Sequence, residues 1–422
     1  MGNIPTVADS NRGNFYPWVI VAASFVVASI TYGTVFSFGV FMTPLREYFG
    51  ATSAAISGAY SLAMLVFSCS GIIAGWGVDK YGPRITTLLG GLLLGLGLLL
   101  TSQVRTVSQL YLTYGLIGIG LSSAHSPLMT TVSRWFVRRR GLALGILSAG
   151  IGGGPLVMAP LSAYLIYTGG WRFAYLVLAC GAGIIMAAAL LLKGSPKNIK
   201  GLPNVEMNNL SISPQRTKAS ELTSELSGFS LRGAISTKSF WQLGVVFLAI
   251  GLSAQMVKVH VVPYGESQGM SPMTAATVLS VLSGISVVGR IMMGMASDWI
   301  GRRKALVICV FTEGAMILWL IGASSVWMFF LFGVIYGFGY GGHGPQLPAL
   351  AGETLGLSHM GTILGSLNFF WGIGGAIGPV LAGLLLDATG SYSSAFMVGA
   401  AGMFLATAMG FLIKTPERKK EA

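Results

Sequence analysis

The sequence predicts an all-α membrane protein with twelve transmembrane helices in two pseudo-symmetric halves of six. Three observations support this prediction. Only 9% of the 422 residues are charged and 53% are hydrophobic, whereas a soluble domain usually has about 25% charged residues. The apolar residues form long runs separated by short basic clusters, the pattern of a polytopic membrane protein. Short motifs of the first half recur in the second half at a nearly constant offset.

The apolar runs predict the individual spans. A helix of about 20 apolar residues crosses a bilayer core of roughly 30 Å. Runs bounded by Gly, Pro and charged residues give twelve such spans. They are residues 17–43, 53–78, 84–103, 107–134, 140–168, 171–193, 240–265, 273–299, 303–321, 325–355, 359–388 and 391–414.

The composition also predicts the domain organisation. Ser, Thr, Asn, Pro and Lys dominate residues 194–239, so we expect a cytoplasmic linker there. Apolar and basic residues alternate at its end, which predicts a short amphipathic helix on the membrane surface. Residues 1–193 and 240–422 then form the two six-helix halves.

The basic residues predict the orientation. If both termini lie on one side, that side receives 21 of the 26 Lys and Arg residues, and the other receives Arg46, Arg105 and Arg172. Cytoplasmic loops are enriched in Lys and Arg, so we expect cytoplasmic termini and a multi-pass protein of the inner (plasma) membrane. The net charge of +13 comes from these loops. We therefore expect membrane lipid around a monomer, and no nucleic acid partner.

Four short motifs of the first half recur, in order, in the second half. The pairs are Gly75–Arg84 with Gly294–Arg303, His125–Pro127 with His343–Pro345, Gly141–Gly145 with Gly361–Gly365, and Gly154-Pro155 with Gly378-Pro379, at offsets of 219, 218, 220 and 224. Duplicated six-helix halves place a substrate site between them, near the middle of the membrane.

The segment Gly75–Arg84 and its copy Gly294–Arg303 resemble the signature loop of the major facilitator superfamily, and the resemblance covers the whole chain. It implies a secondary transporter that works by alternating access. An Asp at a helix end, a Gly turn and a basic cluster can pair with neighbouring helix ends and hold a cytoplasmic gate shut. We expect such a gate, with simple topology and solvation as the alternative. Its candidates are Asp79, Arg84, Arg134, Asp298, Arg303 and Glu353.

Ionisable side chains inside spans are unfavourable and therefore mark candidate functional sites. Arg290 is the main candidate, because it has no acidic neighbour within a helical turn and cannot lose its proton on burial. Its guanidinium group matches a carboxylate in bidentate fashion. We expect a small carboxylate anion as its counter-ion. Pairing with a carboxylate of another span, such as Glu313, and extension to the membrane surface are the alternatives.

The other candidates for the substrate site are His125, His260, His343, Tyr32 and Asn368. Counted from the inner ends of their spans, His125, His343 and Arg290 lie at one depth, ~12–15 Å from the boundary. His125 and His343 each precede a Pro by two residues, so a kink could turn either side chain toward a cavity. Ordinary packing is the alternative. His260 is a candidate for binding substrate or a proton. Its neighbour Lys258 could extend to the outer surface, and Glu313 is expected to be structural.

Three segments resemble the branch of monocarboxylate transporters and the bacterial oxalate:formate exchanger. They are Lys258–Tyr264, the residues around Arg290, and Ser133–Phe136. In that branch an arginine of span 8 binds the substrate carboxylate, which implies this role for Arg290. The exchanger has a lysine in span 11, a few residues after a Phe-Phe-Trp sequence. This chain has the same sequence at Phe369-Phe370-Trp371 but no lysine in the residues that follow directly. Phe36 and Ser286 stand where animal monocarboxylate transporters have a lysine and an aspartate.

These comparisons of residues lead to one expected function and two alternatives. A single fixed cation favours a small monoanion, so we expect proton-coupled transport of a lactate- or pyruvate-like monocarboxylate, with His260, His125 or His343 as proton carrier. Anion exchange of the oxalate:formate kind and general metabolite or drug efflux remain open. The sequence has no phosphate-binding loop, nucleophile triad or metal cluster. An enzyme, a cofactor and a metal site are therefore not expected.

Overall fold

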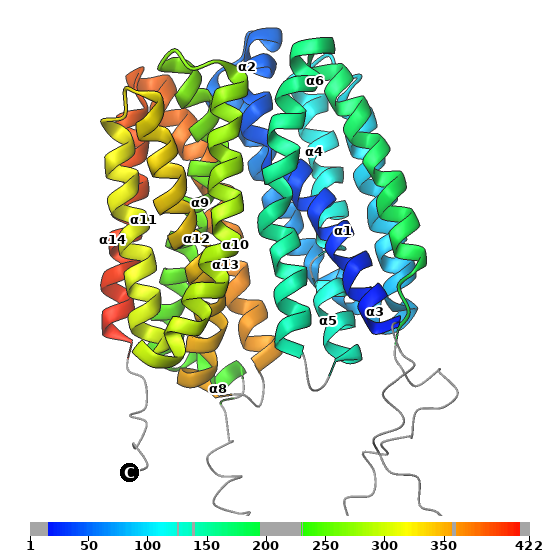
Figure 1. Ribbon diagram of the computed structural model, residues 1–422, viewed down its shortest axis with the longest axis vertical. Helices are drawn as coiled ribbons and strands as arrows, with labels where there is room; N and C mark the ends of the chain where they lie inside the picture. Colours follow the sequence, from blue (N-terminus) through cyan, green and yellow to red (C-terminus); the bar gives the residue numbers. More distant parts are fainter. Residues whose placement is uncertain are drawn as a thin grey trace, which may run out of the picture.

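A computed structural model of the chain describes residues 16–124, 126–136, 140–194, 229, 231–356 and 360–413. These residues are almost entirely helical, and no strand occurs among them. Figure 1 shows two helical bundles side by side, one from each half of the chain. The first helix begins and the last helix ends at the lower end of this view, which we call the terminal end; the other is the opposite end.

The helices follow the expected spans closely. The first bundle contains α1 (Tyr16–Phe36), α2 (Phe38–Phe49), α3 (Ser53–Thr101), α4 (Val107–Ser122), α5 (Ser126–Trp135) and α6 (Arg140–Leu190). The second contains α9 (Lys238–Ser267), α10 (Pro272–Ile300), α11 (Arg302–Ile321), α12 (Val326–Leu355), α13 (Met360–Thr389) and α14 (Tyr392–Leu412). Before it stands the short helix α8 (Leu231–Ile235), while residues 195–228 and 230 of the expected linker lie outside the described residues.

Two of these helices contain a sharp turn. Gly82 in α3 and Gly170 in α6 have φ angles of 83° and 79°, a conformation that a side chain strongly disfavours. Each glycine divides its helix into two spans. Gly301, at the position of Gly82 in the second motif copy, has a φ of 92° and separates α10 from α11. The repeated motif is therefore first of all a glycine-dependent turn between two spans.

Nine of the described helices are long and apolar enough to cross a membrane. This count differs from the twelve expected spans for three reasons. Residues Leu142–Leu190 are counted as one helix although Gly170 divides them. Helix α4 has 16 residues and is separated from α5, so neither is long enough alone. Helix α12 carries many Gly and polar residues, which lower its mean hydropathy, and it is not among the nine.

The two halves meet along α3 with α13 and α6 with α10. At the opposite end two carboxylates of the second half hold the first half. Asp387 of α13 accepts hydrogen bonds from the backbone N–H groups of Ser53 and Ala54, at 2.9 and 2.8 Å. Glu266 of α9 accepts one from the Thr43 hydroxyl at 2.5 Å. Because Ser53 begins α3, Asp387 caps a helix N-terminus across the interface between the halves.

The same interfaces are open toward the terminal end. Near the middle, Gly372 of α13 lies against Ser68 of α3, and Gly152 of α6 lies against Arg290 of α10. One to two turns nearer the terminal end, on the same helix faces, stand glycines that would meet no atom within 4 Å if a Cβ were added. They are Gly71, Gly75, Gly145, Gly294 and Gly365. The structure is therefore closed at the opposite end and open at the terminal end.

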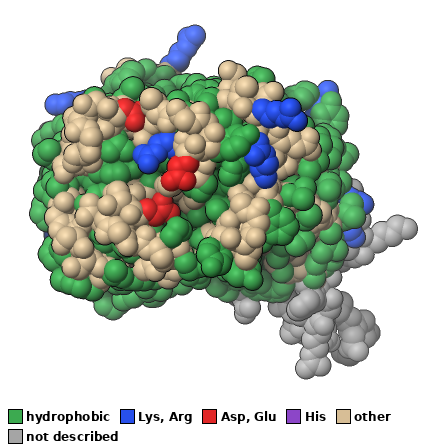
Figure 2. Space-filling model, turned by 90° about the horizontal axis from the view of Figure 1, so that it is seen from above, with side chains coloured by type: hydrophobic (Ala, Val, Ile, Leu, Met, Phe, Trp, Pro, Cys, Tyr) green, Lys and Arg blue, Asp and Glu red, His purple; other side chains and the backbone are tan. Residues whose placement is uncertain are grey.

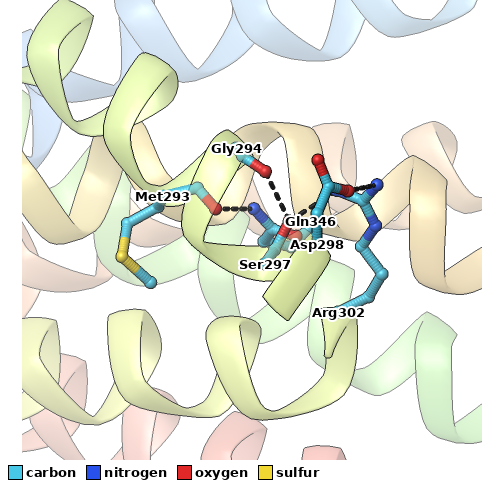
Figure 3. A network of polar contacts seen from close by, with 6 residues as sticks. All are labelled: Met293, Gly294, Ser297, Asp298, Arg302 and Gln346. Carbon is cyan, nitrogen blue, oxygen red and sulfur yellow. Dashed lines mark hydrogen bonds and ion pairs between the residues drawn. The ribbon is translucent and has the colours of Figure 1, made fainter. Parts of the chain in front are cut away.

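The second motif copy makes its contacts within its own half. Arg302 pairs with Asp298 and donates to the Ser297 hydroxyl, and the buried Gln346 of α12 donates to the Met293 carbonyl oxygen at 3.0 Å (Figure 3). The side chains of Arg84, Arg134 and Glu353 are exposed and that of Arg303 is half-buried, whereas the side chain of Asp79 lies outside the described residues. The expected gate thus stays a prediction for a conformation in which the terminal end is closed.

Replacing Asp387 by Ala is expected to favour the conformation that is open at the opposite end. The substitution removes two charge-assisted hydrogen bonds across the interface, each worth about 1.5–3 kcal/mol. We expect at least a tenfold faster reaction of a cysteine at Ser57 with a soluble maleimide. Ser57 is fully buried beside Gly383 of α13, and the exposed Cys69 and Cys180 are replaced by Ser in this background.

Asp298→Ala is the matched control, because it removes an exposed carboxylate at the terminal end that pairs within its own half. It should not raise the labelling rate of Ser57→Cys. An unchanged rate in Asp387→Ala would show that this carboxylate does not hold the opposite end closed.

Candidate functional site

Arg290 lies on the face of α10 that contacts α6. Its Nη1 donates to the backbone carbonyl oxygen of Ser148 in the other half. A Cβ at Gly152, one turn further along α6, would lie 2.9 Å from the Arg290 Cζ atom. The glycine therefore provides the space in which the guanidinium group crosses the interface between the halves.

Lys258 is a second cation in the protein interior, and sequence analysis did not place it there. Its side chain is 3% exposed, so it does not extend to the outer surface. Its Nζ donates to the Tyr340 hydroxyl and lies 3.8 Å from the ring centre of Phe36 and 4.2 Å from that of Tyr340. Cation–π contacts of this kind contribute about 2 kcal/mol when desolvated and only partly replace water around an ammonium group.

Both cations lack an acidic partner within the described part of the chain, where neither has a carboxylate oxygen within 4.0 Å. They lie within Coulombic range of each other and of Tyr340. Tyr32 of α1 and Tyr60 of α3 also lie within range of Tyr340. Two halves thus contribute aromatic hydroxyls around two positive charges that have no direct ion pair, an arrangement suited to an anion.

Glu313, the alternative partner considered for Arg290, pairs with His343 instead. Its Oε1 lies 2.7 Å from His343 Nδ1, and the side chains are 0% and 6% exposed. We expected Glu313 to be structural and His343 to line a cavity. In the structure the two side chains contact each other in the protein interior. The His343 ring also packs edge-on against Tyr340, with 5.2 Å between ring centres.

The remaining predicted residues lie in different surroundings. His260 is fully buried, its Nε2 is 2.9 Å from the Pro379 carbonyl oxygen, and its ring packs on Tyr392, so we leave it out of the site. Tyr32 is buried near Tyr340. Asn368 is exposed on the face of α13 between Gly365 and Gly372, which opens toward the terminal end. His125 lies outside the described residues.

A separate cavity of about 790 Å³ opens at the opposite end. Its lining includes Arg46, Glu47, Glu266 and Tyr392. Figure 2 views this end and shows acidic and basic side chains gathered on it. Thr43 and Glu266, which contact each other, also line this cavity, whereas Arg290 and Lys258 do not. It is therefore distinct from the site around Arg290 and Lys258.

Comparisons with known proteins agree with the fold. The sequence profile of the Major Facilitator Superfamily matches residues 24–312 and 287–422. Monocarboxylate transporter 12 of Xenopus laevis is 27% identical, across 96% of this chain and 90% of its own length. Monocarboxylate transporter 2 of Rattus norvegicus is 28% identical, across 96% and 86%. A solved bacterial homologue of the human lysosomal transporter Spinster, inward-facing and unoccupied, matches with a TM-score of 0.71 at 15% identity, across 95% and 97%, a likeness of fold.

Gly152→Ala is expected to weaken anion binding, because the added methyl group would displace the Arg290 guanidinium. We expect the dissociation constant for lactate or pyruvate to rise roughly 5–10-fold, since one charge-assisted contact of about 1–1.4 kcal/mol is lost or distorted. Binding to the purified protein, measured by isothermal calorimetry, tests this. Gly145→Ala, two turns away on the same face and next to open space, is the control and should bind normally. Equal binding by both variants would contradict the assigned position of Arg290.

Proposed function

Because the chain belongs to the Major Facilitator Superfamily, we propose that it carries small organic anions across the membrane by alternating access, and that a lactate- or pyruvate-like monocarboxylate crosses together with a proton. The observation on which this rests is that the buried Lys258 and the half-buried Arg290 have no carboxylate partner among the described residues. The similarity to the monocarboxylate transporters supports the substrate class.

Electrostatics favour an anion at this position. A carboxylate about 4 Å from a cation gains about 4 kcal/mol at an effective dielectric constant near 20. The Arg290 fork can donate two hydrogen bonds to a carboxylate. Lys258 and the Tyr340 hydroxyl provide further donors nearby, and a 2-hydroxy or 2-oxo acid has an additional oxygen to accept from them. A cationic drug would be repelled by both residues.

The open and closed ends support a transport cycle. In this conformation a solute has access from the terminal end and not from the opposite end. Lys and Arg are concentrated on the terminal side, so we propose that this side is cytoplasmic and that the protein resides in the plasma membrane. The conformation described is then the inward-facing one.

Anion exchange of the oxalate:formate kind is the second candidate, and Lys258 favours it. The chain has no lysine in the few residues after Phe369-Phe370-Trp371, yet a second cation is buried within range of Arg290. Two cations can hold a dianion at its two ends. In exchange the driving force is the anion on the other side of the membrane, and no proton is needed.

Transport into proteoliposomes distinguishes these functions. We expect an inward proton gradient to stimulate uptake of labelled lactate or pyruvate at least tenfold. Arg290→Ala should lower this uptake at least 100-fold, because two hydrogen bonds to a charged group contribute about 1.5–3 kcal/mol each. Arg290→Lys should retain part of it, since the charge remains while the fork is lost.

Arg105→Ala is the matched control, since Arg105 is an exposed arginine near the opposite end, and it should transport normally. Uptake that ignores the gradient, requires internal anion and prefers oxalate would favour exchange instead. No carboxylate uptake by the wild-type protein, or normal uptake by Arg290→Ala, would refute the proposal.

A further inference from the structure

The contact between Glu313 and His343 is specifically accommodated by the fold. Glu313 lies on α11 and points to α12, where a Cβ at Gly339 would come within 3.0 Å of its Cγ atom. The missing side chain at Gly339 therefore lets the carboxylate pass α12 and reach His343 Nδ1 at 2.7 Å. Both side chains are removed from the surface of the bundle.

This pair suits the binding of one proton. With one shared proton the pair is neutral overall, as a carboxylate with an imidazolium or as a carboxylic acid with an imidazole. A net charge on the pair is unfavourable at such depth unless another charge compensates it. The Glu313 Oε2 atom has no hydrogen-bond partner among the described residues, so the pair has little to stabilise a free carboxylate apart from nearby cations.

Those cations belong to the proposed substrate site. The His343 ring touches the Tyr340 ring, and the Tyr340 hydroxyl holds Lys258. Other titratable groups that face the pair are Tyr336 and Tyr340 of α12, Lys258 of α9 and Cys309 of α11, and Arg290 of α10 lies beyond Tyr340. Helix α14, which packs on α11, has only Tyr392 as a titratable side chain, at its first residue.

We propose that Glu313 and His343 together form the proton-binding site that couples proton movement to anion transport. The inference rests on the proposed function and names the residues that carry the proton. In the empty site Lys258 and Arg290 compensate a deprotonated, negative pair. A bound anion neutralises these cations, and the pair then takes up a proton. By reciprocity, protonation of the pair raises the affinity for the anion.

The size of this coupling is set by Coulomb's law. Charges separated by on the order of 10–12 Å at an effective dielectric constant of about 20 change each other's binding about tenfold. The wild-type dissociation constant for lactate or pyruvate should therefore rise about tenfold as the deprotonated form of the pair replaces the protonated form. Binding measured between pH 5 and pH 8 follows this change.

Glu313→Gln is the main test, because it keeps a hydrogen-bonding partner for His343 and removes the titrating carboxylate. We expect the proton gradient to stimulate its uptake less than about twofold. Counterflow, the exchange of labelled for unlabelled substrate without a gradient, should stay within about threefold of wild type. Its substrate binding should not vary with pH. His343→Gln should give the same three results.

His260→Gln is the matched control, since it replaces another fully buried histidine, 2.9 Å from a backbone carbonyl oxygen and outside the site. It should keep the gradient stimulation. Stimulation that survives in Glu313→Gln and His343→Gln would overturn the inference and leave the proposed function intact. Loss of binding and counterflow in both variants would mark the pair as structural and equally overturn it. A wild-type protein that takes up no carboxylate would refute the proposed function itself.

Discussion

The interior of this transporter depends on two positive charges, the buried Lys258 and the half-buried Arg290, with no carboxylate in direct contact in the described part of the chain. Arg290 uses a carbonyl oxygen of α6, and Lys258 uses a hydroxyl group and two aromatic rings. These contacts solvate the cations without neutralising them. Three of the described acids are engaged elsewhere: Glu313 with His343, and Asp387 and Glu266 at the opposite end. In the proposed function a mobile anion supplies the missing charge, as a carrier requires when its ligand must also leave.

Small residues decide where these charges can stand. Gly152 leaves room for the guanidinium of Arg290, and Gly339 leaves room for the side chain of Glu313. Both belong to helices that pack against the helix carrying the charge. The 60 glycines of the chain therefore do more than bring helices together. At these two positions the absence of a side chain determines which partner an ionisable group can reach.

Much of this organisation could be predicted from the sequence, because bilayer thickness and the Gly82 and Gly301 turns fix where spans begin and end. The all-α membrane fold and the superfamily were predicted correctly. The surroundings of single residues could not be predicted in the same way. Lys258 was placed by its distance from a helix end, whereas its burial depends on which face of α9 meets Phe36 and Tyr340. The contact between Glu313 and His343 joins two spans whose relative rotation no periodic pattern specifies.

The open glycines at the terminal end have a consequence for how sequence variation in this protein is interpreted. In the described conformation a methyl group at Gly75, Gly145, Gly294 or Gly365 would touch nothing within 4 Å. In the proposed alternating-access cycle these same faces come together in the other conformation. Selection at such positions would therefore act on a conformation other than the one described. A survey of folding or abundance would score substitutions there as harmless, and only turnover would reveal their effect.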